Sequence, residues 1–127
     1  MERRALIVDD EPVICRLLSR ILARKCWKSV EAHNGREALA AFAAGRFKLV
    51  ICDVSLGSGV DGVDLAKMLL ELEPGLKIAM LTGSIANAQR ARAACLGPVM
   101  LKPFDSAEIA RLLDAASLGQ AQARAGI

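Results

Sequence analysis

Reactive side chains follow short apolar runs at several places in this sequence of 127 residues, and the residues are Asp9, Asp10, Asp53 and Lys102. Clustered carboxylates bind Mg²⁺ through their oxygens, and a lysine ammonium neutralises phosphoryl oxygens. Asp9 and Asp10 stand together after one run, whereas Lys102 follows the last run. These residue types in these places predict a site that handles magnesium and a phosphoryl group.

Short apolar runs alternate along the chain with longer segments of helical periodicity, and this alternation predicts a parallel sheet covered by helices. The expected strands are Ala5 to Val8, Ser29 to Ala32, Leu49 to Cys52, Ile78 to Leu81 and Val99 to Leu101. Most of these runs are continuously apolar, as strands buried on both faces should be. The second run is more polar, so we expect it at an edge of the sheet.

Helix start and stop signals divide the segments between these strands. The expected helices begin at Pro12, and run from Arg36 to Ala44, from Asp61-Gly62 to about Leu72, from about Ile85 to Leu96 and from about Ser106 to Ala116. Gly45 is expected to end the second helix, and Asp105 or Ser106 to cap the fifth. Because residues 117–127 are small and polar, we predict one domain over residues 1–116 and a short, loose C-terminal tail over 117–127.

Composition narrows the possible classes of protein. A hydrophobic content of 54% in 127 residues can fill one sizeable core. The net charge is only +3 and the basic residues are scattered, so we expect no direct nucleic-acid binding. No segment has the character of a signal peptide or membrane span, so we expect a cytoplasmic protein that does not contact the membrane.

The cysteines and the only histidine offer no metal-binding motif. The cysteines are Cys15, Cys26, Cys52 and Cys95, which lack the paired spacing of metal ligands and are expected to be reduced. Cys52 is interpreted as a buried strand thiol. His33 stands beside Asn34-Gly35, and we interpret it as a surface turn residue without a role.

The reactive residues are expected to converge in space. In an open α/β sheet, the ligand site lies outside the carboxyl ends of the strands. The residues expected at such ends are Asp9, Asp10, Asp53, Thr82 and Lys102. Three carboxylates on one patch repel one another, so Mg²⁺ and Lys102 are expected to neutralise them.

Several motifs together resemble those of a known family. They are Leu6-Ile7-Val8-Asp9-Asp10-Glu11, Val50-Ile51-Cys52-Asp53, Asp61-Gly62, Leu81-Thr82-Gly83 and Leu101-Lys102-Pro103-Phe104. In their order and approximate spacing, the chain resembles the receiver domains of bacterial response regulators from about Arg4 to Ala116. The resemblance implies a flavodoxin-like, doubly wound sheet of five parallel strands in the order 2-1-3-4-5, with five helices.

The resemblance also implies a phosphoryl-transfer chemistry. Asp53 would be the phosphoacceptor, receiving its phosphoryl group from a histidine of a sensor histidine kinase or a histidine phosphotransfer protein. The cofactor would be Mg²⁺, held by Asp53, by Asp10 directly, by Asp9 through water and by the backbone carbonyl of Ser55. The domain would catalyse only its own phosphorylation and dephosphorylation.

In the family, phosphorylation changes a binding surface. Lys102 would hold a phosphoryl oxygen, and the Thr82 hydroxyl would donate a hydrogen bond to the phosphoryl group. Movement of Thr82 would reposition the surface formed by the fourth helix, fifth strand and fifth helix, which a downstream protein effector would read.

The sequence departs from the family pattern in places. Val99 stands where receivers commonly have a switch aromatic, and Pro98 precedes the fifth strand. The loop 54–60 is longer than the usual form and lacks its proline. An alternative reading is therefore a receiver-like module that binds proteins without being phosphorylated.

Two rival classes fit the residues less well. A nucleotide-binding or flavin-binding domain would need a glycine-rich turn after the first strand, where this chain has Asp9-Asp10-Glu11-Pro12. A magnesium-dependent phosphatase with an aspartyl nucleophile usually has a second acid two residues after it. That position is Ser55 here.

Overall fold

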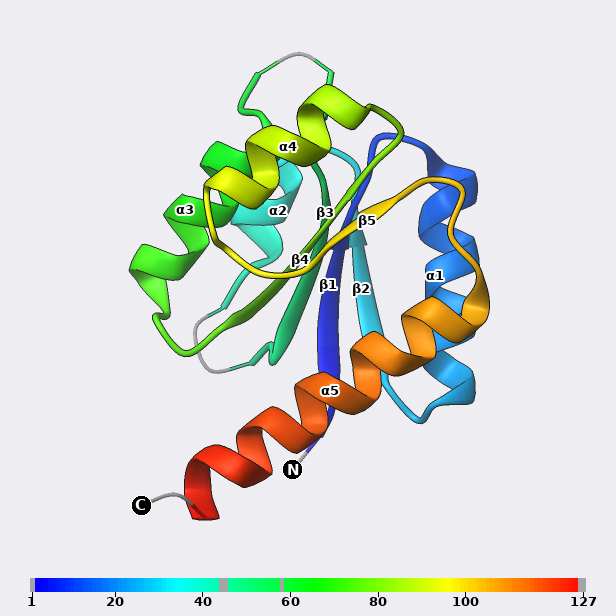
Figure 1. Ribbon diagram of the computed structural model, residues 1–127, viewed down its shortest axis with the longest axis vertical. Coiled ribbons are helices and arrows are strands. Elements are labelled where there is room, and N and C mark those ends of the chain that lie inside the picture. Colours follow the sequence, from blue (N-terminus) through cyan, green and yellow to red (C-terminus); the bar gives the residue numbers. More distant parts are fainter. Residues whose placement is uncertain (1, 44–45, 58, 126–127) are drawn as a thin grey trace.

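The computed structural model describes residues 2–43, 46–57 and 59–125, which form a central sheet with helices on both faces (Figure 1). The strands are β1 (Arg4–Val8), β2 (Lys28–Ala32), β3 (Leu49–Asp53), β4 (Lys77–Thr82) and β5 (Val99–Leu101). The helices are α1 (Pro12–Arg24), α2 (Gly35–Ala41), α3 (Gly62–Leu72), α4 (Ile85–Ala93) and α5 (Ser106–Ala125). The sheet has the order β2-β1-β3-β4-β5 and all neighbouring strands are parallel, which confirms the expected flavodoxin-like fold.

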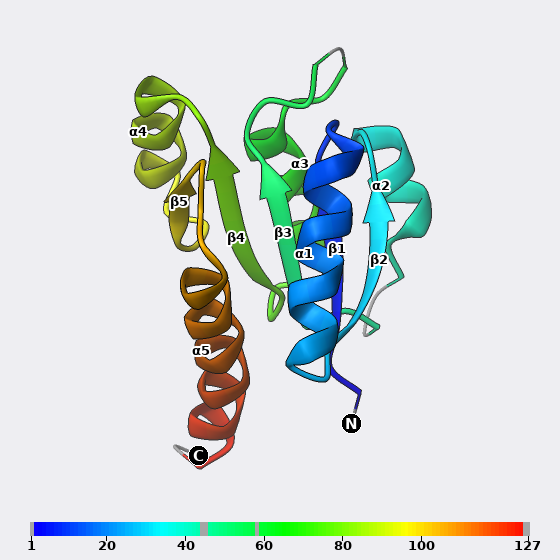
Figure 2. The same cartoon turned by 90° about the vertical axis from the view of Figure 1, so that its right-hand side faces the viewer.

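Alternate side chains of the central strands enter two separate cores, because successive residues of a strand point to opposite faces. Ile7 of β1 packs with Leu18 of α1 and Ile109 of α5 on one face. Leu6 of the same strand packs with Leu65 of α3 on the other face. Figures 1 and 2 show the resulting layers, with α1 and α5 covering one face and α2, α3 and α4 the other.

β2 forms one edge of the sheet, as its polar sequence predicts. Of its five residues only Ala32 is buried. β1, its neighbour, is flanked on the other side by β3, and four of its five residues are buried. The polar and apolar runs of the sequence therefore correspond to edge and central positions.

Side-chain caps begin the helices after the first. Asn34, Asp61 and Ser84 each accept a hydrogen bond from the backbone N–H three residues later. In α5 the cap is Asp105, which accepts from the Glu108 N–H at 2.8 Å while the Glu108 carboxylate accepts from the Asp105 N–H at 3.2 Å. This reciprocal capping box identifies Asp105 as the cap.

Two helices end earlier than expected. α2 ends at Ala41 because Phe42 has extended backbone angles, so the predicted continuation to Ala44 was wrong. The predicted stop at Gly45 lies outside the described residues. α4 ends at Ala93, before the expected Leu96, and Cys95 lies in the left-handed region with φ of 55°.

The fifth helix is longer than expected. It continues past Ala116 to Ala125, so the predicted helix end at about Ala116 was wrong. The predicted domain over residues 1–116 with a C-terminal tail over 117–127 stays a prediction. Alanine, glutamine, leucine and arginine are frequent in this stretch, and their helix propensities favour continuation of the helix. Residues 126–127 lie outside the described residues. Among those described, no helix has both the length and the apolar character needed to cross a bilayer.

Candidate functional site

Acidic side chains from β1 and β3 meet at the carboxyl edge of the sheet. Asp9 and Asp10 follow β1, and Asp53 is the last residue of the neighbouring strand β3. Together with Glu11, they offer carboxylate oxygens that all lie within 4.8 Å of one another. The three aspartates therefore converge, as the sequence predicts. Glu11 is a fourth carboxylate of this group, and it was not predicted as part of the site.

Lys102 bonds several members of this acidic group from the end of β5, at the same carboxyl edge of the sheet. It follows β5, and its Nζ lies 2.9 Å from Asp9 Oδ2, 2.9 Å from Asp53 Oδ2 and 3.5 Å from Glu11 Oε1. The Asp9 side chain is 0% exposed and that of Asp53 is 8% exposed. Buried carboxylates need a cation or hydrogen-bond donors to stay ionised. The lysine therefore supplies positive charge where water cannot.

The pKa values of this group show how burial and pairing compete. Burial raises the pKa of the Asp9 carboxyl, although hydrogen bonds from Lys102 and from the Glu11 backbone act in the opposite direction. Burial alone would lower the pKa of the Lys102 ammonium, but its hydrogen bonds to Asp9 and Asp53 outweigh burial and raise that pKa. The lysine therefore stays charged at neutral pH. A further cation beside Asp9 would stabilise its ionised carboxylate, which burial disfavours.

The backbone around Asp53 is held tightly. Asp53 Oδ1 accepts a hydrogen bond from the Ser55 N–H at 3.1 Å, which leaves Oδ2 for Lys102. Gly62 at the start of α3 packs against the same peptide, where any β-carbon would overlap the Asp53 carbonyl oxygen. Only glycine allows this approach. The first turn of α3 therefore fixes the strand end that carries Asp53.

Thr82 occupies the corresponding end of β4. It is 2% exposed, and its Oγ1 accepts a hydrogen bond from the Ser84 N–H at 3.1 Å. A hydroxyl that accepts one bond still has its proton to donate. The Thr82 carbonyl accepts from the Lys102 N–H at 2.8 Å, so this residue links β4, β5 and the start of α4.

These side chains line one open pocket of about 380 Å³, which we call the carboxylate pocket. Its lining residues are Asp10, Glu11, Asp53, Ser55, Thr82, Gly83, Ser84, Asn87 and Lys102. Every predicted site residue except Asp9 reaches this pocket, because Asp9 lies buried beneath it.

Some pocket residues were not predicted from the sequence. Glu11 could have been found, because it continues the acidic run after β1. Ser84 carries the signal of a helix cap, but Asn87 has no motif and enters the pocket only because α4 starts at its rim.

The donor set of the pocket suits a small, hard cation. Asp10 is exposed, and its carboxylate belongs to a group that offers only oxygen ligands. Oxygen-only ligation with room for water is the coordination that Mg²⁺ prefers. The residues present could therefore hold such an ion, and the part predicted for the Ser55 carbonyl stays a prediction.

Two departures from the family motifs lie in the loop after β3 and at the start of β5. In the loop after β3, Gly57 and Gly59 have φ of 76° and 92°, in the left-handed region that glycine tolerates best. Val99, at the position of the usual switch aromatic, is half-buried and pairs with Met80 of β4. An aliphatic residue therefore occupies the position of the usual switch aromatic.

Known proteins have sequences related to this chain over most of its length. A family model described as the response regulator receiver domain matches residues 5–114. The transcriptional regulatory protein ResD of Bacillus subtilis is 34% identical over 110 residues, which cover 85% of this chain and 45% of ResD. Sporulation initiation phosphotransferase F of Bacillus subtilis is 28% identical over 111 residues, which cover 86% of this chain and 89% of that protein. This chain therefore spans less than half the length of ResD.

Solved structures agree with the sequence relatives. The receiver domain of NtrX from Brucella abortus superimposes with a TM-score of 0.80 at 30% identity, covering 88% of this chain and 96% of that domain. A response regulator of Burkholderia pseudomallei, solved with a phosphorylated aspartic acid, a calcium ion and citrate, gives 0.78 at 33% identity and covers 95% of this chain and 72% of that one. The motifs, the strand order and these matches lead to one conclusion, that this chain belongs to the response regulator receiver family of two-component signalling.

Proposed function

We propose that this receiver accepts a phosphoryl group on Asp53 in a reaction that depends on Mg²⁺. The observation that supports it best is the meeting of Asp53 with Asp9, Asp10 and Lys102 around one open pocket. A carboxylate beside a fixed cation, with further carboxylates for a metal, is the arrangement that aspartyl phosphorylation needs. Beyond its own phosphorylation and dephosphorylation, we propose no reaction for the domain.

In the proposed reaction a carboxylate oxygen of Asp53 attacks phosphorus. The phosphoryl group comes from a phosphohistidine, so the new O–P bond forms as the P–N bond breaks and the imidazole leaves. Lys102 Nζ donates a hydrogen bond to Asp53 Oδ2. It would therefore lie close to a phosphoryl group on Asp53 and could exchange this bond for one to a phosphoryl oxygen. A bound Mg²⁺ would neutralise charge on the other phosphoryl oxygens.

The aspartates would contact the metal in different ways. Asp10 is exposed and would bind directly, with Asp53 and the Ser55 carbonyl beside it. Asp9 is buried, and its two oxygens already accept hydrogen bonds from Lys102 and from the Glu11 N–H. We therefore propose that Asp9 acts through water and through the orientation of Lys102.

We propose that Thr82 carries the phosphorylation signal to α4. A hydrogen bond from Thr82 Oγ1 to the phosphoryl group would draw this oxygen away from the Ser84 N–H. Ser84 in turn caps α4 through its bond to the Asn87 N–H at 3.2 Å. The start of α4 would therefore move, and with it the surface formed by α4, β5 and α5, where Ile85 and Leu101 are exposed.

The partners follow from this chemistry. A sensor histidine kinase or histidine phosphotransfer protein would supply the phosphoryl group, and a downstream protein effector would bind the switched surface. We expect cytoplasmic partners and no direct nucleic-acid binding by this domain. ResD is named a transcriptional regulator and is more than twice as long as the matched segment, so such an output would need further chain.

The proposed function can be tested by intact mass. We expect incubation with acetyl phosphate or phosphoramidate and Mg²⁺ to add one phosphoryl group. The gain should vanish in Asp53→Asn and without Mg²⁺, but persist in Asp64→Asn, which changes an exposed aspartate of α3. A gain that persists in Asp53→Asn would contradict the assignment of the phosphoacceptor.

A second candidate, a receiver that binds partners without phosphorylation, is favoured by Val99 at the position of the switch aromatic. Under this alternative, no donor adds mass in the presence of Mg²⁺. Partner binding would also be equal for wild type and Asp53→Asn.

A further inference from the structure

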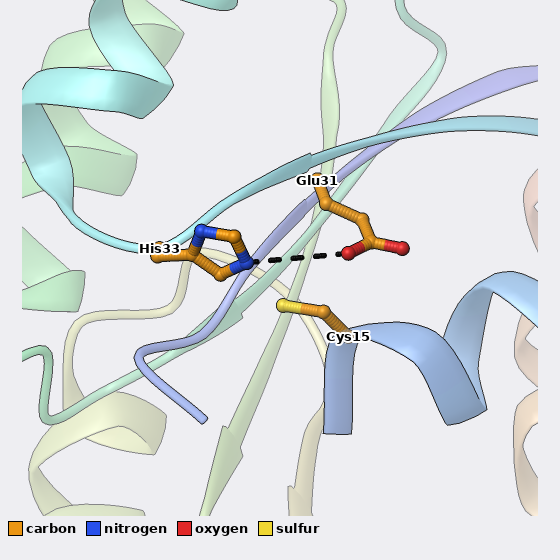
Figure 3. Close-up of side chains that lie close together, drawn as sticks. All are labelled: Cys15, Glu31 and His33. Carbon is orange, nitrogen blue, oxygen red and sulfur yellow. Dashed lines mark ion pairs between the residues drawn. The ribbon is translucent and has the colours of Figure 1, made fainter. Parts of the chain in front are cut away.

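A second cluster of reactive side chains lies at the β2 edge, and the carboxylate pocket does not use it. Cys15 is on α1, Glu31 on β2 and His33 in the turn after β2. Their ligand atoms all lie within 4.8 Å of one another. Figure 3 shows the Cys15 sulfur and the Glu31 carboxylate directed toward the His33 imidazole.

We propose that Cys15, Glu31 and His33 form a binding site for Zn²⁺, with the fourth coordination position open to water. Thiolate, imidazole and carboxylate are the ligand types that zinc takes in proteins, and three protein ligands with one open position make a known coordination pattern. A thiolate and an imidazole also select against Mg²⁺, which prefers oxygen. The two clusters would therefore bind different ions.

Binding one ion requires the three ligand atoms, which lie within 4.8 Å of one another, to move closer together. Ligands about 2.0–2.3 Å from one zinc ion lie roughly 3.3–3.8 Å apart in a tetrahedron. His33 Nε2 and Glu31 Oε1 are 4.0 Å apart, so they must approach by a few tenths of an ångström. Their side chains are 41% and 32% exposed, so both can adjust and an ion can enter from their side.

The imidazole is already oriented for metal binding. His33 Nδ1 lies 3.3 Å from Glu37 Oε1, which also accepts a hydrogen bond from the His33 N–H at 3.0 Å. A carboxylate on one ring nitrogen fixes the tautomer and leaves the other nitrogen as the ligand, as in carboxylate–histidine–zinc arrangements. Glu37 thus directs the free Nε2 toward Glu31 and Cys15 (Figure 3).

Hydrogen bonds from residues that are not zinc ligands also orient the Glu31 carboxylate. Glu31 Oε2 accepts a hydrogen bond from Ser19 Oγ at 2.8 Å, and Ser19 Oγ accepts from Ser29 Oγ at 3.2 Å. Glu31 Oε1 therefore remains to face His33. Outer hydrogen bonds on both the histidine and the carboxylate are what a metal site requires beyond its ligands.

Cys15 is the buried member of the cluster. It is 0% exposed, and its Sγ donates a hydrogen bond to the Asp9 carbonyl at 3.4 Å. As the S–Zn bond forms, the S–H bond breaks and the proton passes to solvent. The thiolate and Glu31 together then balance the double positive charge of the ion.

The test uses the whole chain with Cys26→Ser and Cys95→Ser, since these exposed thiols would also bind zinc. With excess Mg²⁺ to occupy the carboxylate pocket, Zn²⁺ is titrated against a chromogenic chelator, and Co²⁺ is added separately as a spectroscopic probe. We expect one Zn²⁺ per chain and a thiolate-to-cobalt charge-transfer band. Both should be lost in Cys15→Ser and His33→Gln.

An outer-partner variant separates an organised site from chance binding. Glu37→Gln should weaken zinc binding by about 10- to 100-fold, because it removes the carboxylate that orients His33. Glu71→Gln, an exposed glutamate of α3, should leave zinc affinity unchanged. Equal affinities of the two glutamate variants would contradict the proposed role of Glu37.

Other outcomes would overturn the site itself. Cys15→Ser places a hydroxyl in the core, so circular dichroism must show that each variant folds. His33→Gln changes a half-exposed side chain, so we expect this variant to fold. It can therefore still test the site if Cys15→Ser does not fold. Unchanged zinc affinity in His33→Gln, or a cobalt complex without the thiolate band, would show that the ion binds elsewhere.

Discussion

The carboxylate pocket and the Cys15–Glu31–His33 cluster lie on either side of Asp9, and they differ in how their charges are held. In the pocket, Lys102 bonds the buried carboxylates of Asp9 and Asp53. In the cluster, Glu31 and His33 are half-exposed and the buried member is a thiol, whose sulfur bonds the Asp9 carbonyl. The pocket therefore contains ionised carboxylates that are buried from water, whereas the buried group of the cluster is the neutral Cys15 thiol. A buried carboxylate site needs a permanent cation, and a buried thiol does not.

Removing that cation should give the largest effect. We expect Lys102→Met to lower the free energy of unfolding by about 3 kcal/mol or more, because two buried carboxylates lose their partner. Urea unfolding without Mg²⁺ measures the loss, which should shrink when Mg²⁺ is added. The control is Lys25→Met, which breaks the exposed 3.1 Å pair with Asp114 and should lower stability by at most about 1 kcal/mol. Equal losses in the two variants would mean that Lys102 does not hold a buried charge network.

Thiol labelling should separate the cluster from the exposed cysteines. Cys15 and Cys52 are buried, whereas Cys26 and Cys95 are exposed. Burial, together with the charges of Asp9 and Glu31, raises the pKa of Cys15 to about 11, so little thiolate forms at pH 8. In the native protein we expect a disulfide reagent to modify Cys26 and Cys95 rapidly and Cys15 at least about 100-fold more slowly. Peptide mapping that finds Cys15 among the fast thiols would contradict the buried position.

A smaller effect is expected from the exposed carboxylate of the pocket. Asp10 repels its neighbours, and Lys102 bonds Asp9, Glu11 and Asp53 instead. We expect Asp10→Asn to raise the metal-free stability by roughly 1 kcal/mol, since one like charge is removed at a solvated position. The same change should abolish phosphorylation and the rise in melting temperature that Mg²⁺ gives the wild type. A metal-free mutant that melts below wild type would show that Asp10 contributes favourable contacts.

The smallest effect tests the outer part of the cluster. Ser19→Ala removes the hydrogen bond to Glu31 Oε2 without changing a ligand. We expect zinc affinity to fall by about tenfold and unfolding stability to change by less than about 1 kcal/mol. Chelator competition and urea unfolding measure the two quantities. A large loss of stability with unchanged zinc affinity would assign Ser19 to the fold alone.

The carboxylate pocket was largely predictable from the sequence. Asp53 and Thr82 end strands, and Asp10 and Lys102 follow strands closely, so a parallel sheet brings all of them to one edge. The strand order came from the resemblance to receivers, because periodicity alone gives strands without their neighbours. The neutralising role of Lys102 was expected, but its particular bonds to Asp9 and Asp53 depend on burial and side-chain reach, which the sequence does not show.

Helix ends were less predictable than strands. α3 follows its signals from Asp61-Gly62 to Leu72, whereas α5 continues past the expected end to Ala125. Strand positions depend on burial, which the apolar runs report directly. A helix end without proline or a strong cap depends on small differences in propensity and on what the last turn contacts.

The sequence by itself determined the sheet, its carboxyl edge and the residue types of the carboxylate pocket. Only the tertiary structure decided that Cys15, Glu31 and His33 meet. Their spacing matches no metal motif, because Cys15 belongs to α1 while Glu31 and His33 belong to β2 and the turn after it. They come together because α1 packs over the sheet while β2 pairs with β1, and side-by-side packing of separate elements leaves no local pattern in a sequence.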